Sequence, residues 1–384
     1  MVSQHPRQMS EAEKFLCELI ALPSVNPAFA PPDDPRVGEE RVADFLAATA
    51  ARAGLPVEFQ KVARGRANFI TRLSPTAKTS TRILLAPHLD TVPAANEKQF
   101  SPVKKGGRIY GRGACDTKGS VAAMLTALIS FAKNFPRPQH TEIIFAGLVD
   151  EEDGQLGSRA LAASGLKASL AIVGEPTDSK IVTAHKGSLW LRLETRGKAA
   201  HGSRPECGKN AVHEMARVVD LLETKYADLL RRGQHSLLGH ATISVGTICG
   251  GTQANIVPDR CFITADRRTL PGETEQTVCR ELKNLLRAEK LSAAISSSKS
   301  ASCPALETDS TNPLIEQFFQ VVGQKKLLGV NYFCDAAVLS AAGIPSVVFG
   351  PGNIAQAHTA DEWISTASLA CATEKLLQFF RKLP

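Results

Sequence analysis

Short apolar segments alternate with a helical pattern through the first half of the chain. The segments "RILLAP", "TEIIFAGLV" and "ASLAIVG" are nearly continuous apolar runs of strand length, and "GSVAAMLTALISFAKNF" between the first two has the composition of a buried helix. Such runs are typical of strands in a sheet that is covered on both faces. The alternation therefore predicts an α/β fold with a sheet between helices. At 384 residues, the chain is long enough for two domains.

A different pattern begins near residue 181. The segments "SLWLRLET" and "ATISVGTI" alternate like half-exposed antiparallel strands, and a long helical segment lies between them. Together with "CFITADRR", a second helix and "SAAISSS", they give a β-α-β-β-α-β order, which predicts an inserted α+β domain of ferredoxin-like type. The first pattern returns after about residue 301, with "IPSVVFG" and a closing amphipathic helix. We therefore expect a discontinuous sheet domain over 1–180 and 301–384, and an inserted domain over 181–300.

Local signals predict two helices near the N-terminus. Ser10 and Glu13 have the spacing of a capping box in front of an apolar pattern that runs to Ile20. A second helical pattern starts at about Glu39 and stops at Gly54.

Composition excludes several classes of function. The net charge is +7, but the basic residues are scattered and aromatic residues are only 5%, so we expect no nucleic-acid partner. The nine cysteines include no CxxC pair, which argues against a thiolate metal site or a disulfide framework and favours the reducing cytoplasm. The N-terminus has no apolar signal core, and no run of 18 apolar residues is present, so we expect no secretion and no membrane span.

Carboxylates and imidazoles follow the predicted strands. In open α/β sheets, functional groups gather just beyond the carboxyl ends of the strands. One such residue alone would be an ordinary loop or cap residue, but here they follow five strand-like segments. The residues are His88 and Asp90 after "RILLAP", Asp116 after "RIYGRGAC", Glu151 and Glu152 after "IIFAGLVD", Glu175 after "LAIVG", and His358 after "GNIAQAH".

This set of side chains predicts a metal centre. Two imidazoles and three or four carboxylates are the N/O ligands of borderline divalent metals, and they outnumber the ligands of one tetrahedral zinc. Two ions that share one carboxylate fit the count and offset the repulsion within "DEE". Asp90 lies two residues after His88 on a strand-like backbone, so its carboxylate can accept the second imidazole N–H. Of Glu151 and Glu152, one can bind metal while the other takes a proton from the attacking water.

The same motifs carry a family resemblance. In order, "PHLDTVPA", "GRGACDTKGSVAAML", "DEEDGQLGSR", "GEPT", "AAHGSRPECGKNAV", "GGTQANIVPDRC", "DRRTLPGE" and "AHTADEWI" resemble the metallopeptidase family that contains acetylornithine deacetylase, succinyl-diaminopimelate desuccinylase, aminoacylase and glutamate carboxypeptidase. The resemblance covers nearly the whole chain. It implies a zinc-exopeptidase-like catalytic domain with a mixed sheet, an inserted dimerisation or lid domain, and hydrolysis of an amide bond next to a free carboxylate.

The resemblance also implies a ligand set for two Zn²⁺ ions, with Co²⁺ as a possible substitute. His88 and Glu175 would hold one ion, Glu152 and His358 the other, and Asp116 would bridge the two.

Five further residues receive roles from the resemblance. Glu151 would be the general base, and Asp90 would orient His88. His201 would reach the active site of the partner subunit in a homodimer and stabilise the oxyanion. Asn255 and Arg267 would bind a small N-acyl amino acid substrate.

The substrate and one wall of the pocket are less defined. "GACDTKG", "GEPT" and "DRRTLPGE" resemble the acetylornithine deacetylase group most, and the desuccinylase, a broad aminoacylase and a glutamate carboxypeptidase-type enzyme are the alternatives. The family often has a tryptophan where this chain reads "AANEKQFSP", at 94–102. A catalytically silent ligand-binding member is a weak alternative because no ligand or base is missing. A cysteine hydrolase that uses Cys115 is weaker still, because no His–Asn or His–Asp order stands out.

Overall fold

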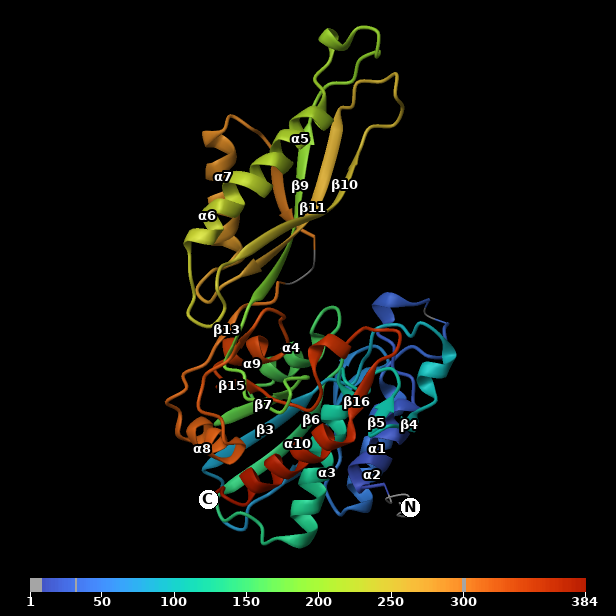
Figure 1. The fold of residues 1–384 in the computed structure, drawn as a ribbon, viewed down its shortest axis with the longest axis vertical. Helices are drawn as coiled ribbons and strands as arrows, with labels where there is room; N and C mark the ends of the chain where they lie inside the picture. Colours follow the sequence, from blue (N-terminus) through green and yellow to red (C-terminus); the bar gives the residue numbers. More distant parts are fainter. Residues whose placement is uncertain (1–8, 32, 299–301) are drawn as a thin grey trace, which may run out of the picture. The chain divides into compact units, whose positions relative to one another are not determined.

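The computed structural model describes residues 9–31, 33–298 and 302–384, and the chain divides into two compact units (Figure 1). The first unit is discontinuous, and the second is inserted into it. The domain boundary expected at 300/301 lies outside the described residues. The first unit comprises Met1–Thr183, Thr308–Leu328 and Cys334–Pro384; the second comprises Ala184–Glu307 and Gly329–Phe333.

A six-stranded mixed sheet forms the centre of the first unit. Its order is β1-β2-β6-β3-β7-β15, in which β6, β3, β7 and β15 are parallel neighbours and β1 and β2 pair antiparallel at one edge. The three apolar runs of the sequence are the three central parallel strands, as predicted. The strands are β1 (Glu58–Ala63), β2 (Arg66–Leu73), β3 (Thr81–Pro87), β6 (Thr141–Gly147), β7 (Leu170–Gly174) and β15 (Ser346–Val348).

Both faces of this sheet are buried. On β3, Ile83 and Leu85 belong to a core cluster that includes residues of the long helix α3, whereas Leu84 between them points to the other face and is also fully buried. Figure 1 shows α3 beside α10, while α9 packs on β7 and β15. The helices are α1 (Glu11–Ile20), α2 (Glu40–Arg52), α3 (Lys118–Asn134), α4 (Leu156–Ala163), α8 (Pro313–Val322), α9 (Ala336–Ala341) and α10 (Thr366–Phe380), with short turns η1 (Pro27–Phe29), η2 (Glu97–Phe100) and η5 (Ile354–Gln356).

The two predicted N-terminal helices are α1 and α2. The Ser10 hydroxyl accepts a bond from the Glu13 N–H at 3.3 Å, and the Ser10 N–H donates to Glu13 Oε2 at 2.8 Å, which confirms the capping box. After α2 the chain turns at Gly54, whose φ of 75° lies in the left-handed region that glycine adopts without strain.

A separate three-stranded sheet contains the segment "RIYGRGAC". Its first residues form β5, which pairs with β4 and with β16 from the end of the chain and not with the central sheet. The expectation that Asp116 directly ends a strand is therefore wrong: Asp116 lies in the turn between β5 and α3. These strands are β4 (Val103–Lys105), β5 (Arg108–Tyr110) and β16 (Trp363–Ser365).

The second unit has the predicted ferredoxin-like order. Its antiparallel sheet is arranged β10-β11-β9-β12, with α5, a π-helical turn and α6 after β9, and α7 after β11. The long helical segment predicted between "SLWLRLET" and "ATISVGTI" thus contains a π-helical segment. The elements are β9 (Gly187–Arg196), η3 (Pro205–Cys207), α5 (Ala211–Leu221), η4 (Leu222–Tyr226), α6 (Ala227–Arg232), β10 (Thr242–Gly250), β11 (Arg260–Thr269), α7 (Glu275–Ala288) and β12 (Ala294–Ser297), with a small sheet of β13 (Leu306–Glu307), β8 (Ala184–His185) and β14 (Gly329–Val330).

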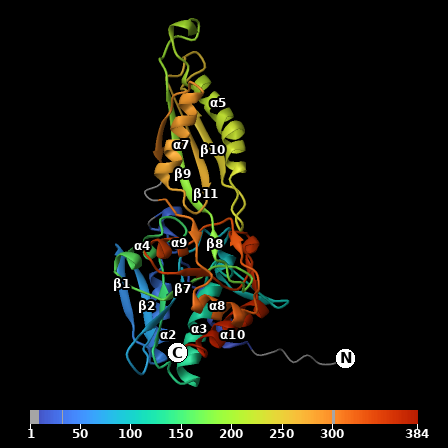
Figure 2. The same cartoon turned by 90° about the vertical axis from the view of Figure 1, so that its left-hand side faces the viewer.

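Helices cover one face of the second unit's main sheet. In Figure 2, α5 and α7 lie in front of β9 and β11. Leu189 and Leu191 of β9 pack in the core beneath the helices, while Trp190 between them is 45% exposed on the other face. The alternation predicted for half-exposed strands is therefore present. Within the described residues, no helix is long and apolar enough to cross a membrane.

Candidate metal centre

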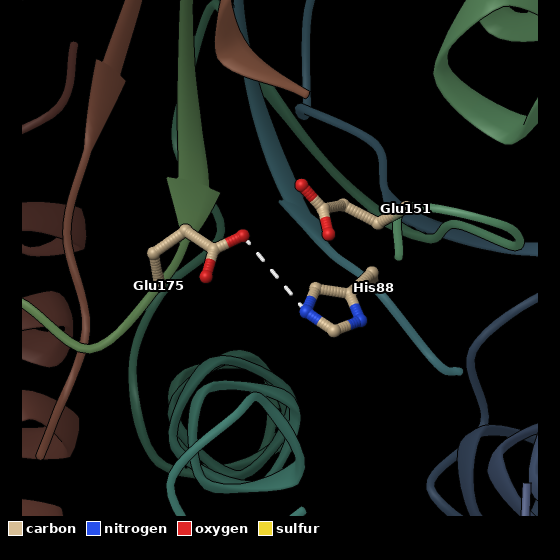
Figure 3. Close-up of side chains that lie close together, drawn as sticks. All are labelled: His88, Glu151 and Glu175. Atoms are coloured by element: carbon tan, nitrogen blue, oxygen red, sulfur yellow. Dashed lines mark ion pairs between the residues drawn. The ribbon is translucent and has the colours of Figure 1, made fainter. Parts of the chain in front are cut away.

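Three of the predicted site residues meet where the central parallel strands end. His88 comes directly after β3, Glu175 directly after β7, and Glu151 four residues after the end of β6. Because β6, β3 and β7 are parallel neighbours, their carboxyl ends lie side by side. The ligand atoms of His88, Glu151 and Glu175 lie within 4.8 Å of one another, and all three residues are buried. Figure 3 shows the three side chains pointing toward one another, with His88 Nε2 3.9 Å from Glu175 Oε1.

Asp116 lies between the two predicted histidine ligands. Its Oδ1 is 3.1 Å from His88 Nε2, and its Oδ2 is 3.2 Å from His358 Nε2. His358 Nε2 is also 3.2 Å from Glu152 Oε2. His358 follows η5 at a φ of 61° and leaves about half of its side chain exposed. The structure therefore brings together all five predicted ligands, with Asp116 in the middle.

The acidic groups of this cluster perturb one another. Burial raises the pKa of Glu151, and the neighbouring carboxylate of Glu175 raises it further. Burial likewise raises the pKa of Glu175. Hydrogen bonds that His358 donates to the carboxylates of Asp116 and Glu152 raise its pKa to about 10. The cluster therefore contains more acidic charge than its two imidazoles can balance.

The donor set fits divalent cations. Imidazole nitrogen and carboxylate oxygen are the ligands of zinc and similar ions, and the second group of mutually close donors is His88, Asp116 and Glu152. Glu175 Oε1 is buried and has no hydrogen-bond partner among the described residues, which is costly for a polar atom unless a cation supplies the interaction. The two groups share His88, and Asp116 presents one oxygen to each imidazole. The residues present therefore fit a divalent metal centre, with Asp116 between its two imidazoles.

Asp90 holds the loop that carries the two glutamates. Its Oδ1 accepts the Glu151 N–H and its Oδ2 accepts the Glu152 N–H, both at 3.1 Å. His88 Nδ1 lies 3.0 Å from the carbonyl oxygen of Asp90 and 3.5 Å from its Oδ1. The imidazole thus faces Asp90 as predicted, although the shorter contact is to the backbone. Asp90 is fully buried, and the hydrogen bond from His88 lowers its pKa against the effect of burial.

Asp150, the first of four consecutive acidic residues, does not join the cluster. At a φ of 72° it turns aside, where Arg66 Nη1 contacts its Oδ1 at 2.6 Å. Asn26 Nδ2 donates to Asp150 Oδ1 at 3.1 Å and to Asp90 Oδ2 at 2.7 Å, so it ties the two carboxylates together. Arg66 also pairs with buried Glu39. Repulsion within the "DEE" segment is thus relieved on one side by an arginine.

Sequence reasoning missed Asn26 and Arg66. Each lies far along the chain from Asp150, and no local pattern connects them. The asparagine in "SVNP" stands just before a proline and caps η1 through its side-chain oxygen, which is an ordinary loop role. The side-chain nitrogen of Asn26 is the atom that contacts the site, through its bonds to Asp90 and Asp150.

Two predicted residues lie on adjacent segments of the second unit. His201 and Asn255 are both exposed, and Gly202 N–H donates to the Asn255 carbonyl at 2.7 Å. His201 Nδ1 accepts from Ser203 Oγ at 2.7 Å and from the Ser203 N–H at 3.2 Å. Nε2 therefore carries the proton of the neutral imidazole and is available as a donor.

Arg267 does not present its guanidinium to a ligand. It is fully buried on the helix-covered face of β11, where it contacts Tyr226 Oη at 3.2 Å and also Glu273 and the Arg268 carbonyl. The neighbouring Arg268 lies on the opposite face, retains 29% of its side-chain exposure and pairs with Asp266. This arrangement does not support the expected carboxylate clamp, because a substrate cannot reach the side chain of Arg267.

The stretch 94–102, which lacks the family's tryptophan, contains η2. Gln99 is buried and donates through Nε2 to the Thr359 carbonyl at 3.2 Å, next to His358. The segment thus supports the loop of a predicted ligand.

Comparison with known proteins agrees with this geometry. Residues 84–382 match the peptidase family M20/M25/M40. The acetylornithine deacetylase of Proteus mirabilis (strain HI4320) is 30% identical over 372 residues, with 94% of each chain covered. That of Myxococcus xanthus is 29% identical over 344 residues, with 85% of this chain and 87% of the relative covered.

Solved structures share the fold. A tripeptidase from Staphylococcus aureus subsp. aureus mu50 aligns with a TM-score of 0.77 at 22% identity, over 97% of each chain. A metallo-carboxypeptidase from Sulfolobus solfataricus aligns with a TM-score of 0.74 at 19% identity, over 97% of this chain and 99% of that one. The chain therefore belongs to the M20/M25/M40 peptidase family, and is a metallohydrolase that acts on amide bonds.

Proposed function

We propose that the protein is a two-zinc deacylase that hydrolyses an N-acetyl amino acid to acetate and the free amino acid, in the manner of an acetylornithine deacetylase. The observation that carries this proposal is the position of Asp116, with one carboxylate oxygen toward His88 and the other toward His358. A carboxylate so placed can bridge two cations. Co²⁺ is a reasonable substitute for Zn²⁺, since the same N and O donors bind both.

In this proposal, each metal position has its own pair of ligands besides Asp116. His88 and Glu175, 3.9 Å apart, would hold one ion, and Glu152 and His358, 3.2 Å apart, would hold the other. The ions would polarise the amide carbonyl and make water a stronger nucleophile at neutral pH. Hydrolysis breaks the bond between the acyl carbon and the amide nitrogen.

Glu151 is the residue we assign to proton transfer. Its carboxylate is buried beside His88 and Glu175, and its backbone N–H is fixed by Asp90. As general base, it takes a proton from the attacking water and passes it to the departing amine nitrogen. The neighbouring cations would favour the ionised carboxylate that this role requires, against the effect of burial.

The acyl amino acid is the preferred substrate because the curated relatives that cover most of the chain are acetylornithine deacetylases. Desuccinylase, broad aminoacylase and glutamate carboxypeptidase-type activities are the alternatives within the same chemistry. A silent ligand-binding protein is a weaker alternative, since the base and all five ligands are present. We further propose a role in arginine biosynthesis, and a cytoplasmic location because the cysteine pattern suits a reducing compartment.

The second unit is proposed to form a homodimer. His201 offers an imidazole donor on an exposed segment, and we assign it to the oxyanion in the partner's site, with Asn255 beside it at the substrate. Arg267 is left out of this assignment because it is fully buried.

A substrate panel on metal-depleted and zinc-restored protein tests the proposal. N-acetylornithine, N-succinyl-diaminopimelate, other N-acyl amino acids and dipeptides are compared by kcat/KM. We expect the highest value for N-acetylornithine, no activity after chelation, recovery with zinc and two ions per chain by metal analysis. Preference for a dipeptide or a succinylated substrate would contradict the deacetylase assignment, and a single bound ion at full activity would contradict the two-metal arrangement.

A further inference from the structure

The turn that carries Asp116 is held by a carboxylate from the other end of the chain. Glu362 lies just before β16 and is 1% exposed. Its Oε1 accepts the N–H groups of Cys115 at 2.8 Å and of Asp116 at 2.9 Å. Its Oε2 accepts the N–H of Gly113 at 2.9 Å. Three backbone donors of one turn thus converge on a single side chain.

An arginine of the same turn completes the arrangement. Arg112 is 3% exposed; its Nη1 donates to Glu362 Oε2 at 2.7 Å, and its Nη2 donates to the Thr359 carbonyl at 3.2 Å. Thr359 follows His358 directly. Arg112 and Glu362 therefore connect the segments of two predicted ligands that lie more than 240 residues apart in sequence.

We propose that Glu362, with Arg112, is a positioning residue that fixes Asp116 between the two metal positions. The inference rests on the proposed two-metal function. Glu362 does not act as a ligand, because both of its oxygens already accept two hydrogen bonds each. Its effect passes through the backbone of Asp116 and through the turn that follows His358.

The chemistry of the turn requires a carboxylate at this position. Four donors face the side chain, and a carboxylate offers only acceptors. Bonds from a guanidinium and from backbone N–H groups to a charged oxygen are stronger than bonds between neutral groups. A glutamine of the same shape would direct its NH₂ group at two of these donors, so the turn would have to shift and would carry Asp116 with it.

Zinc binding by three purified variants tests the inference. Glu362→Gln removes the carboxylate, and Arg112→Lys keeps the three backbone bonds but loses the fork that reaches Thr359. Glu142→Gln is the matched control: Glu142 is also buried and paired with an arginine, Arg82 at 2.8 Å, but lies near the amino end of β6, away from the site. Each metal-free protein is titrated with Zn²⁺ against a competing chelator, and its unfolding midpoint is measured separately.

We expect Glu362→Gln to bind zinc about 10- to 100-fold more weakly at one or both positions, the range seen when partners of metal ligands are replaced. The Co²⁺ absorption spectrum should change in the same variant, because the geometry at Asp116 changes. Glu142→Gln should keep the affinity and the spectrum of the parent. If Glu362→Gln does not fold, Arg112→Lys must show the weaker binding.

Unchanged zinc affinity and an unchanged Co²⁺ spectrum in a folded Glu362→Gln protein would overturn the inference. An equal loss in Glu142→Gln would also overturn it, because the effect would then be a general one of removing a buried ion pair. Failure of the parent protein to bind two ions would instead overturn the proposed function. The two failures can be told apart, because a failure of the inference alone leaves a parent enzyme that binds two ions and turns over normally.

Discussion

The Glu151 side chain is the most sharply testable group of the site, because Glu152 beside it offers a natural comparison. We expect Glu151→Gln to retain zinc and to lower kcat by about 10²-fold or more, the usual effect of removing a general base. Glu152→Gln should lose zinc, because it removes a proposed ligand. Metal analysis and steady-state kinetics of both variants check this. Parent-like turnover in Glu151→Gln, or zinc loss equal to that of Glu152→Gln, would contradict the assignment.

We expect the buried His185 to make the free energy of unfolding depend on pH. His185 is fully buried and donates through Nδ1 to the Lys186 carbonyl at 2.9 Å. Its Nε2 has no hydrogen-bond partner within the part of the chain that the structure describes. Burial lowers the pKa of His185 to about 4 from the ordinary value of 6.5. Between these two values, the unfolded chain binds a proton that the folded chain does not bind. Stability therefore falls as the pH falls from 6.5 to 4, by up to about 3 kcal/mol.

Urea unfolding at a series of pH values measures this dependence. His185→Gln should flatten the fall in the free energy of unfolding between pH 6.5 and 4. His213→Gln, which replaces an exposed histidine of α5, should leave it unchanged. An identical slope in the parent and in His185→Gln would show that other groups are responsible.

Strand β11 determines the roles of two adjacent arginines. Because successive side chains of a strand point to opposite faces, Arg267 is buried with Tyr226 and Glu273 while Arg268 is partly exposed. We expect Arg267→Lys to lower the free energy of unfolding by about 1–3 kcal/mol, because a lysine cannot reach all three acceptors and leaves buried groups unpaired. Arg268→Lys should cost less than about 1 kcal/mol. Chemical denaturation checks both, and equal losses would contradict the difference in environment.

Gly157, the second residue of α4, has no room for a side chain, because the backbone of the connection from β6 lies against it. A Cβ there would lie 2.5 Å from both the backbone nitrogen and the carbonyl oxygen of Val149. Gly157→Ala should therefore destabilise the protein by about 1–3 kcal/mol and lower activity, since Val149 leads directly into the Asp150–Glu152 segment. Gly246→Ala is the control, because the nearest atom is 3.9 Å away. Thermal unfolding that is the same for both variants would show that the backbone near Val149 moves at little cost.

At the scale of the whole molecule, activity is expected to require two chains. Glu151 belongs to the first unit and His201 to the second, and the proposal pairs them across a homodimer. His201→Ala and Glu151→Gln should each be inactive, whereas a mixed dimer contains one intact site. Equal mixing with free exchange should restore about a quarter of the parent activity. Subunit exchange demonstrated with labelled chains, but without recovered activity, would contradict the shared site.

Much of this molecule could be predicted from local patterns. The apolar runs of β3, β6 and β7 indicate buried parallel strands, and such strands end at one edge of a sheet. His88, Glu151 and Glu175 therefore had to lie near one another once the order of the strands was set. The β-α-β-β-α-β order of the second unit likewise follows from its periodicity.

Other features depend on contacts between distant segments. Asp116 and His358 reach the cluster from loops outside the central sheet, and Glu362 holds Asp116 from nearly 250 residues away. Asn26 and Arg66 stabilise the acidic segment through bonds that no local pattern reveals. For Arg267, sequence alone determined only that two adjacent arginines would face opposite sides of β11. The tertiary structure decided which one is buried, because only the packing of the helices defines the covered face of the sheet.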